Sequence, residues 1–283
     1  ENIFNNILVK DFDGIYIKSK ESVFSLLTYI FKSPALSDEY NFEKTDIRRQ
    51  LFHRLEAFTL STFHRFKNFE NHFKENFLDM IKLNYSIKEI IEHLIIMEEV
   101  NIRRNFVTEI YFNIEHFFSV IIKEFNIEIV DARSKQSLLN HILEHFDIDE
   151  KIELGTKFSK MFERLNENNE NFKSLFEGMR NTKTTYLEIN NRLINRRNSL
   201  HSNGFTNGKI EAPLGIGKIK YKKIEKFAAI ETMGITDLVV LMFIAIECCE
   251  KIISETVFSH QGIIVDRYME EIEELKNSQN KFI

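Results

Sequence analysis

The sequence predicts an all-α protein, and three observations support this fold class. The chain of 283 residues contains neither Pro nor Gly between Pro34 and Gly155, which favours long helices over strands and turns. It is 43% hydrophobic and 29% charged, the balance of a folded globular protein. Apolar residues recur at three- and four-residue spacing, the period of an amphipathic helix. The clearest stripe consists of Val107, Ile110, Tyr111, Ile114, Phe117, Phe118, Ile121, Ile122 and Phe125.

The same periodicity locates each helix along the chain. It places them near residues 20–32, 42–82, 86–127, 135–147, 151–166, 169–201 and 235–257. Polar residues gather at 68–76 and 98–105, where we expect the two longest helices to break. Ahead of the first helix, GIYIK at 14–18 alternates like a short strand.

A small β element is expected after the sixth helix. Residues 205–230 hold four Gly or Pro turn signals between two alternating runs, which predicts a β-hairpin or an ordered loop. Thr236 and Asp237 offer an N-cap for the last helix. We divide the chain into an N-terminal helical region, residues 1–100, and a second helical domain, residues 101–283.

The longest apolar run, LVVLMFIAI at 238–246, is too short to span a membrane. Its nine residues are about half of the roughly 18 that a transmembrane helix needs, so a buried core helix is expected. The two cysteines, Cys248 and Cys249, are adjacent in this helix and point in different directions. They are poor disulfide partners, which favours a reducing, cytoplasmic location.

Charge is distributed unevenly along the chain. The net charge is −5, which alone argues weakly against a nucleic-acid partner. Residues 170–230, however, carry 12 Lys or Arg against five Glu, a local charge of +7. Such a run is most often a solvated face, but it also suits a phosphate-binding surface.

Several common catalytic and metal-binding motifs are missing from the sequence. It has no GxGxxG, no GxxxxGK[ST], no HExxH and no CxxC pair, and no cofactor is expected. His141 and His145 have i,i+4 spacing on a helix, which can bind metal. Because no third ligand accompanies them, we expect a surface or packing role and no metal site.

The segment INRRNSLHSNG, residues 194–204, is the remaining candidate for a site with chemistry. Helical spacing places Arg197 and His201 on one side of the helix, with Arg196 about a quarter-turn away and Asn198 beyond. A histidine can take the proton of a ribose 2′-hydroxyl, and an arginine can stabilise charge on the phosphate. The simpler interpretation is that basic residues complement the helix dipole before an Asn-Gly stop.

This segment resembles the signature of the HEPN superfamily (higher eukaryotes and prokaryotes nucleotide-binding), an arginine, four residues and a histidine at the end of a long helix. Arg196 and His201 fit that spacing, and Asn198 is the polar residue that follows. The resemblance covers roughly residues 100–260. It implies an all-α bundle that dimerises to bring two motifs into one cleft, and it does not explain the additional N-terminal helices of residues 1–100. Many members are metal-independent ribonucleases, and others are helical interaction modules.

The chain departs from the common form, in which Asn directly follows the motif arginine. Here the Arg-Asn pair is Arg197-Asn198, which leaves two residues before His201. Either Arg196 acts and Asn198 is shifted, or Arg197 acts at the shorter spacing. A regular helix through His201 favours Arg197, whereas unwinding near Ser199 favours Arg196, the assignment that the family pattern prefers.

The resemblance implies a metal-independent endoribonuclease, a toxin or phage-defence (abortive-infection) effector that leaves 2′,3′-cyclic phosphate ends. His201 would act as base or acid, Arg196 or Arg197 would hold the phosphate, and Asn198 would orient it. Basic residues of the inserted segment would guide the RNA backbone: Lys209, Lys218, Lys220, Lys222, Lys223 and Lys226. Expected partners are RNA, a second copy of the chain, and an antitoxin or defence protein, with no membrane. The alternatives are a non-catalytic module that binds a nucleotide or a partner protein, and a purely structural bundle.

Overall fold

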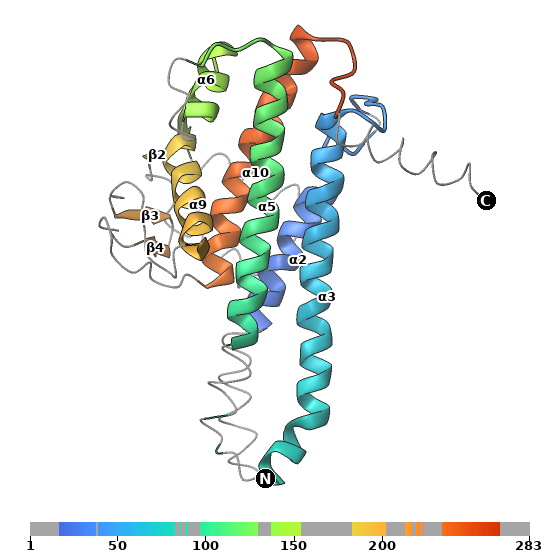
Figure 1. Ribbon diagram of the computed structural model, residues 1–283, viewed down its shortest axis with the longest axis vertical. Coiled ribbons are helices and arrows are strands. Elements are labelled where there is room, and N and C mark those ends of the chain that lie inside the picture. Colours follow the sequence, from blue (N-terminus) through green and yellow to red (C-terminus); the bar gives the residue numbers. More distant parts are fainter. Residues whose placement is uncertain are drawn as a thin grey trace, which may run out of the picture.

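The apolar stripes produce a bundle of long helices, seen in the computed structural model of the chain (Figure 1). The structure describes residues 17–37, 39–82, 86, 89, 97–129, 137–153, 183–201, 213–216, 219–221, 223 and 234–266. Its described helices are α2 (Lys18–Phe31), α3 (Ile47–Lys82), α5 (Met97–Glu124), α6 (Ser137–His145), α9 (Tyr186–His201) and α10 (Ile235–Ser259). The predicted all-α class is confirmed.

The helices are arranged around α10 and α5. In Figure 1, α5 lies in front of α10, with α3 on one side of it and α9 on the other. Helix α2 packs against α3 and α10, so the N-terminal helices share the core of the later ones. Residue 100 lies inside α5. The division of the chain near that residue stays a prediction.

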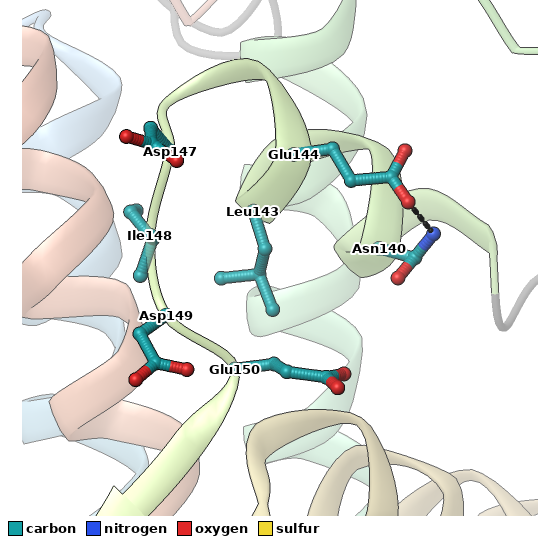
Figure 2. Close-up of a pocket in the computed structure, with 7 residues that line it drawn as sticks. All are labelled: Asn140, Leu143, Glu144, Asp147, Ile148, Asp149 and Glu150. Carbon is teal, nitrogen blue, oxygen red and sulfur yellow. Dashed lines mark hydrogen bonds between the residues drawn. The ribbon is translucent and has the colours of Figure 1, made fainter.

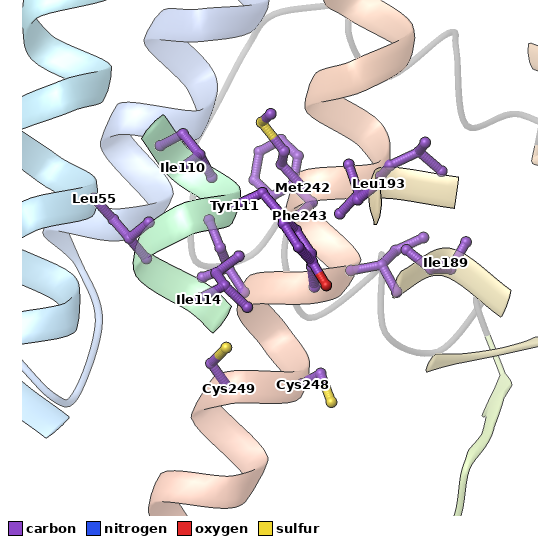
Figure 3. Packing of buried hydrophobic residues seen from close by; sticks show 14 of the residues in the cluster. Leu55, Ile110, Tyr111, Ile114, Ile189, Leu193, Met242, Phe243, Cys248 and Cys249 are labelled. Atoms are coloured by element: carbon purple, nitrogen blue, oxygen red, sulfur yellow. The ribbon is translucent and has the colours of Figure 1, made fainter. Parts of the chain in front are cut away.

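The core forms where the predicted stripes meet (Figure 3). Tyr111 and Ile114 of α5, Leu193 of α9 and Phe243 of α10 converge there, together with Leu55 of α3. Residues 238–246 are all buried, as predicted for a core helix. Full burial of each large apolar side chain contributes about 1.5–3 kcal/mol to folding, so this shared core dominates the stability of the bundle.

Cys248 and Cys249 are both buried and free, in agreement with their expected failure to pair. Among the described residues, no helix combines the length and the apolar character that crossing a membrane requires.

Two short strand pairs accompany the helices. Strands β3 (Leu214–Ile216) and β4 (Ile219–Tyr221) pair antiparallel, with Leu214 opposite Tyr221, so the hairpin predicted within 205–230 is confirmed. Strands β1 (Lys151–Glu153) and β2 (Lys183–Thr185) also pair antiparallel. These six residues were expected to be helical, and that prediction is wrong for them.

Three further local predictions differ from the structure. Helices α3 and α5 run without a break through 68–76 and 98–105, because their polar residues include no helix breaker. Lys18 begins α2 instead of ending a strand, while residues 14–16 lie outside the described part of the chain. The N-cap of α10 is Gly234, with no side-chain capping bond, and Thr236 Oγ1 lies 3.1 Å from Ser22 Oγ of α2 instead.

The segment after α10 closes the bundle against the start of α3. Asp46 forms an isolated antiparallel bridge with Val265, and the Ile47 amide donates to the Ile264 carbonyl at 2.8 Å. Arg48 is buried beside Asp46 and donates to it at 2.6 Å, and also to the Gly262 carbonyl at 2.7 Å. This pairing fixes the position of the next residue, Asp266, between α3 and α5.

Candidate functional site

The helix that carries the motif begins at a well-defined cap. The Glu188 amide donates to Thr185 Oγ1 at 3.1 Å, and Thr184 Oγ1 donates to the Glu188 carboxylate at 2.8 Å. The Tyr186 amide donates to the Glu150 carbonyl at 3.0 Å, which ties the helix start to the chain before β1. A capping Thr with a Glu three residues later satisfies amides that the first turn leaves unpaired. These bonds fix the orientation of α9 about its own axis, and hence which of its residues face α5.

Helix α9 continues to His201, so the chain does not unwind near Ser199. In a regular helix, residues four apart lie about 40° apart around the axis, and residues five apart about 140°. The backbone therefore places Arg197 and His201 on the same side, with Arg196 turned away. The regular helix through His201 therefore favours Arg197 over Arg196 as the partner of His201. The side chain of His201 lies outside the described part of the structure, as do Gly204 and its neighbours.

Arg197 faces α5. Its Nη1 pairs with the carboxylate of Glu115, and its guanidinium lies over the ring of Tyr111, 5.3 Å from the centroid. Asn198 Oδ1 accepts from Nε and Nη2 of Arg197 at 3.2 and 3.0 Å. The Arg197 side chain is 11% exposed. A carboxylate, an amide and an aromatic face thus hold the guanidinium at the edge between α9 and α5.

Tyr111 forms the floor beneath that guanidinium. It is buried and donates from its hydroxyl to Asn190 Oδ1 of α9 at 3.0 Å. Burial, followed by the nearby Glu115 charge, raises the pKa of the Tyr111 hydroxyl far above its usual value. The phenol therefore stays neutral and acts as a fixed hydrogen-bond donor between the two helices.

Arg196 lies on another side of α9, in line with Arg192 one turn earlier. Both are buried, Arg196 with 8% of its surface exposed. The Arg192 guanidinium lies 5.8 Å from the ring centroid of Tyr221 in β4, and Tyr221 donates to the Asp237 carbonyl at 2.9 Å. Burial raises the pKa of Tyr221, which the charges of both arginines partly offset. Arg196 therefore belongs to the packing between α9, the hairpin and the start of α10.

Sequence reasoning missed a second polar cluster, which joins α5 to α3 and to the segment after α10. Asp266 is fully buried and pairs with Arg54 of α3, and its Oδ1 lies 3.1 Å from Nε2 of His116 on α5. In the sequence, His116 lies 150 positions and Arg54 lies 212 positions before Asp266, so no local pattern could reveal these contacts. Glu115, the partner of Arg197, was missed for the same reason, at a separation of 82 positions.

The solvent-facing side of α5 lies between the Glu115–Arg197 ion pair and the cluster around Asp266. Phe112 is on this side, with 59% of its surface exposed. Residues three and four apart on a helix are neighbours, so Phe112 adjoins Glu115 on the side of α9 and His116 on the side of α3. The exposed aromatic ring is thus bordered by polar and charged side chains.

The predicted RNA-guiding lysines are only partly described. Lys220 is exposed on the outer face of the β3–β4 hairpin, opposite Gly215, and Lys223 is exposed just after it. Burial of Leu214, Ile216, Ile219 and Tyr221 fixes the inner face of the hairpin. The remaining lysines lie outside the described residues: Lys209, Lys218, Lys222 and Lys226.

The two histidines of α6 take packing positions. His145 lies against Phe146 and Phe125, with ring centroids 4.8 and 6.0 Å away, and His141 Nδ1 is 3.9 Å from Glu144 Oε2. Within the described ranges, no three His, Cys, Asp or Glu side chains are grouped as metal ligands would be.

A surface pocket of about 610 Å³ opens beside α6 and the start of β1 (Figure 2). Its lining includes four carboxylates, from Glu144, Asp147, Asp149 and Glu150. Asp147 adopts a positive φ of 52° where the chain turns out of the helix. The concentration of negative charge repels a phosphate backbone, so this pocket does not suit RNA.

Comparison with protein-family models, with curated proteins and with solved structures finds no match for this chain.

Proposed function

We propose that this chain is a metal-independent endoribonuclease of the HEPN type, with its site at the C-terminal end of α9. The observation that carries the proposal is the regular helix through His201, which places Arg197 and His201 one turn apart. Glu115, Asn198 and the Tyr111 ring hold Arg197 in a fixed position. A fixed guanidinium on the residue one helical turn from a histidine matches what cleavage of an RNA phosphodiester needs.

In the proposed reaction His201 takes the proton of a ribose 2′-hydroxyl. The 2′-oxygen attacks the adjacent phosphorus, and the bond from phosphorus to the 5′-oxygen breaks. The products are a 2′,3′-cyclic phosphate and a 5′-hydroxyl, whose oxygen takes up a proton. Arg197 stabilises the charge that gathers on the non-bridging phosphate oxygens, and the fixed position of its planar fork lowers the reorganisation that this requires.

One histidine supplies one proton-transfer group, whereas the reaction uses an acid and a base. A homodimer that brings two α9 ends together would provide both, and we include it in the proposal. Lys220 in the β3–β4 hairpin and Lys223 just after it are exposed, and in this proposal they add positive charge that attracts the RNA backbone. The proposed biological role is that of a cytoplasmic toxin or phage-defence effector with an antitoxin or defence protein as partner.

The test is cleavage of a labelled RNA by the purified chain in the presence of EDTA, followed by analysis of the ends. We expect cleavage that persists in EDTA and leaves 2′,3′-cyclic phosphates. Complete inhibition by EDTA, or products with 3′-hydroxyl ends, would contradict the proposed mechanism.

A second function, non-catalytic binding of a nucleotide or a partner protein, is favoured by one observation. Arg197 is already paired with Glu115 and mostly buried, as is typical of a structural ion pair. The two functions differ in the outcome of the cleavage assay. A chain that binds RNA or a nucleotide but cuts no RNA in any buffer is a binding module.

A further inference from the structure

We propose that Phe112 is a stacking platform for a nucleobase of single-stranded RNA that lies along the outward side of α5. This inference rests on the proposed function and specifies its substrate class. Bases of a single strand are free to stack on an aromatic ring, whereas those of a duplex are already stacked on each other.

The first argument is the exposure of the ring. Phe112 stands in the stripe of α5 that faces solvent, and 59% of its surface is in contact with water. The buried face of the same helix is complete without it, since Tyr111 and Ile114 provide the packing there. Phe112 therefore adds little to the core, while a stacked base would remove its exposed apolar surface from water.

The second argument is the chemistry around the ring. One turn along α5 from Phe112, Glu115 pairs with the Arg197 guanidinium, which in turn donates to Asn198 of α9. On the other flank, His116 and Arg54 are held by Asp266. A phosphate that competes with Glu115 for the Arg197 guanidinium would lie beside a base that covers the ring, which is the combination that single-strand binding sites use.

The third argument concerns a protein partner, which the same face fits less well. A stable protein interface buries about 800 Å² on each partner and has an apolar centre. Around Phe112 the outward residues of α5 are polar or charged, including Thr108, Glu109 and Ser119. One aromatic ring in such a setting provides too little apolar area for a stable dimer, and enough for one base.

Exposed phenylalanines elsewhere in the chain provide a matched control. Phe31, the last residue of α2, is 66% exposed, and α2 packs against α3 and α10. Phe31→Ala and Phe112→Ala remove the same side chain from a similarly exposed helix position. Both variants should fold as the unchanged chain does, which circular dichroism and thermal unfolding can verify.

The experiment measures binding of a fluorescent single-stranded oligoribonucleotide to the full chain carrying His201→Ala, which prevents cleavage. We expect Phe112→Ala to weaken binding roughly tenfold, as for loss of one stacked base, and Phe31→Ala to leave it unchanged. Phe112→Trp should restore binding. Introducing abasic positions one at a time should identify one site at which the oligonucleotide no longer distinguishes Phe112 from Ala.

Three outcomes would overturn the inference. Equal affinity of the Phe112→Ala and Phe31→Ala chains would leave the ring without a role in RNA binding. Conversion of a dimer to a monomer by Phe112→Ala, with RNA affinity unchanged, would make Phe112 a contact between two copies. Both outcomes leave the proposed nuclease intact if the chain with an intact His201 cuts RNA. Absence of any RNA binding or cleavage would overturn the nuclease as well.

Discussion

Glu115 of α5 and Arg197 of α9 form an ion pair across the edge of the bundle, with the ring of Tyr111 beneath the guanidinium. The pair joins the proposed phosphate-binding group to a neighbouring helix. It also places a carboxylate where a phosphate oxygen would bind. In the proposed function, RNA would therefore compete with Glu115 for Arg197, and this competition leads to the first prediction.

Glu115→Gln removes the competing charge and keeps an oxygen that can accept from Arg197. We expect RNA to bind several-fold more tightly, because charge repulsion at the site is lost. The free energy of unfolding should fall by about 1–2 kcal/mol, since an ion pair becomes a hydrogen bond from the charged guanidinium to a neutral amide. Fluorescence anisotropy and urea unfolding measure the two effects. Weaker RNA binding in Glu115→Gln would show that the carboxylate holds Arg197 in its productive position.

The two adjacent arginines should separate function from stability. Arg197→Ala should reduce kcat/KM for RNA cleavage by about 10²-fold or more, as for loss of a group that stabilises transition-state charge. Arg196→Ala should lower the free energy of unfolding by about 1–3 kcal/mol, because the buried side chain packs against the hairpin. Cleavage per folded molecule should persist in that variant. The reverse pattern, with activity lost only in Arg196→Ala, would contradict the assignment made from the regular helix.

Asp266 should be a major stabilising residue although it lies just after the last described helix. Asp266→Asn replaces the carboxylate that pairs with Arg54 by a neutral amide and weakens the contact with His116. We expect the free energy of unfolding to fall by about 2–3 kcal/mol, because the carboxylate is fully buried. Asp79→Asn is the control, since Asp79 pairs with Lys82 on an exposed surface and should change stability by less than about 0.5 kcal/mol. Similar effects of the two substitutions would show that the buried cluster does not stabilise the fold.

Asp237 gives the stability of the chain a predictable pH dependence. Burial raises the pKa of its carboxyl above the usual 3.8, and a hydrogen bond from the Gly234 backbone partly offsets this. The folded state thus favours the protonated form, a contribution that is full below pH 3.8 and lost as the pH rises through the raised pKa. Asp237→Asn cannot ionise. Its stability relative to the unchanged chain should therefore increase between pH 4 and pH 7.

Urea unfolding of both chains at several pH values measures this difference, and effects of other titrating groups largely cancel in it. A difference that stays constant, or that shrinks toward pH 7, would contradict the role assigned to burial of Asp237.

The sequence predicted the long helices well because each carries many repeats of one period. Burial follows that period along α5, except at Asn113, which is buried and donates to the Glu109 carbonyl at 2.7 Å. Strands β1 and β2 escaped prediction because three residues show no period and their pairing joins segments about 30 residues apart. The hairpin was found because Gly and Pro turn signals lie between two alternating runs in residues 205–230.

The candidate site was predicted only as far as local sequence extends. The spacing of Arg197 and His201 depends on the helix alone. The sequence therefore left two alternatives, Arg196 or Arg197, as the partner of His201. The choice between them needed the continuity of α9 through His201. Glu115 and Asp266 act through contacts between distant segments, which a single sequence does not encode in any local pattern.

The central claim is that α9 carries a ribonuclease site in which His201 takes the proton of the 2′-hydroxyl. The most direct test compares the unchanged chain with His201→Ala on an RNA cut at one position, and on the same RNA with a single 2′-deoxyribose there. We predict cleavage of the first RNA by the unchanged chain only, and no cleavage of the 2′-deoxy RNA at that position by either protein. Undiminished cleavage by a folded His201→Ala chain, or cleavage at the 2′-deoxy position, would contradict the claim.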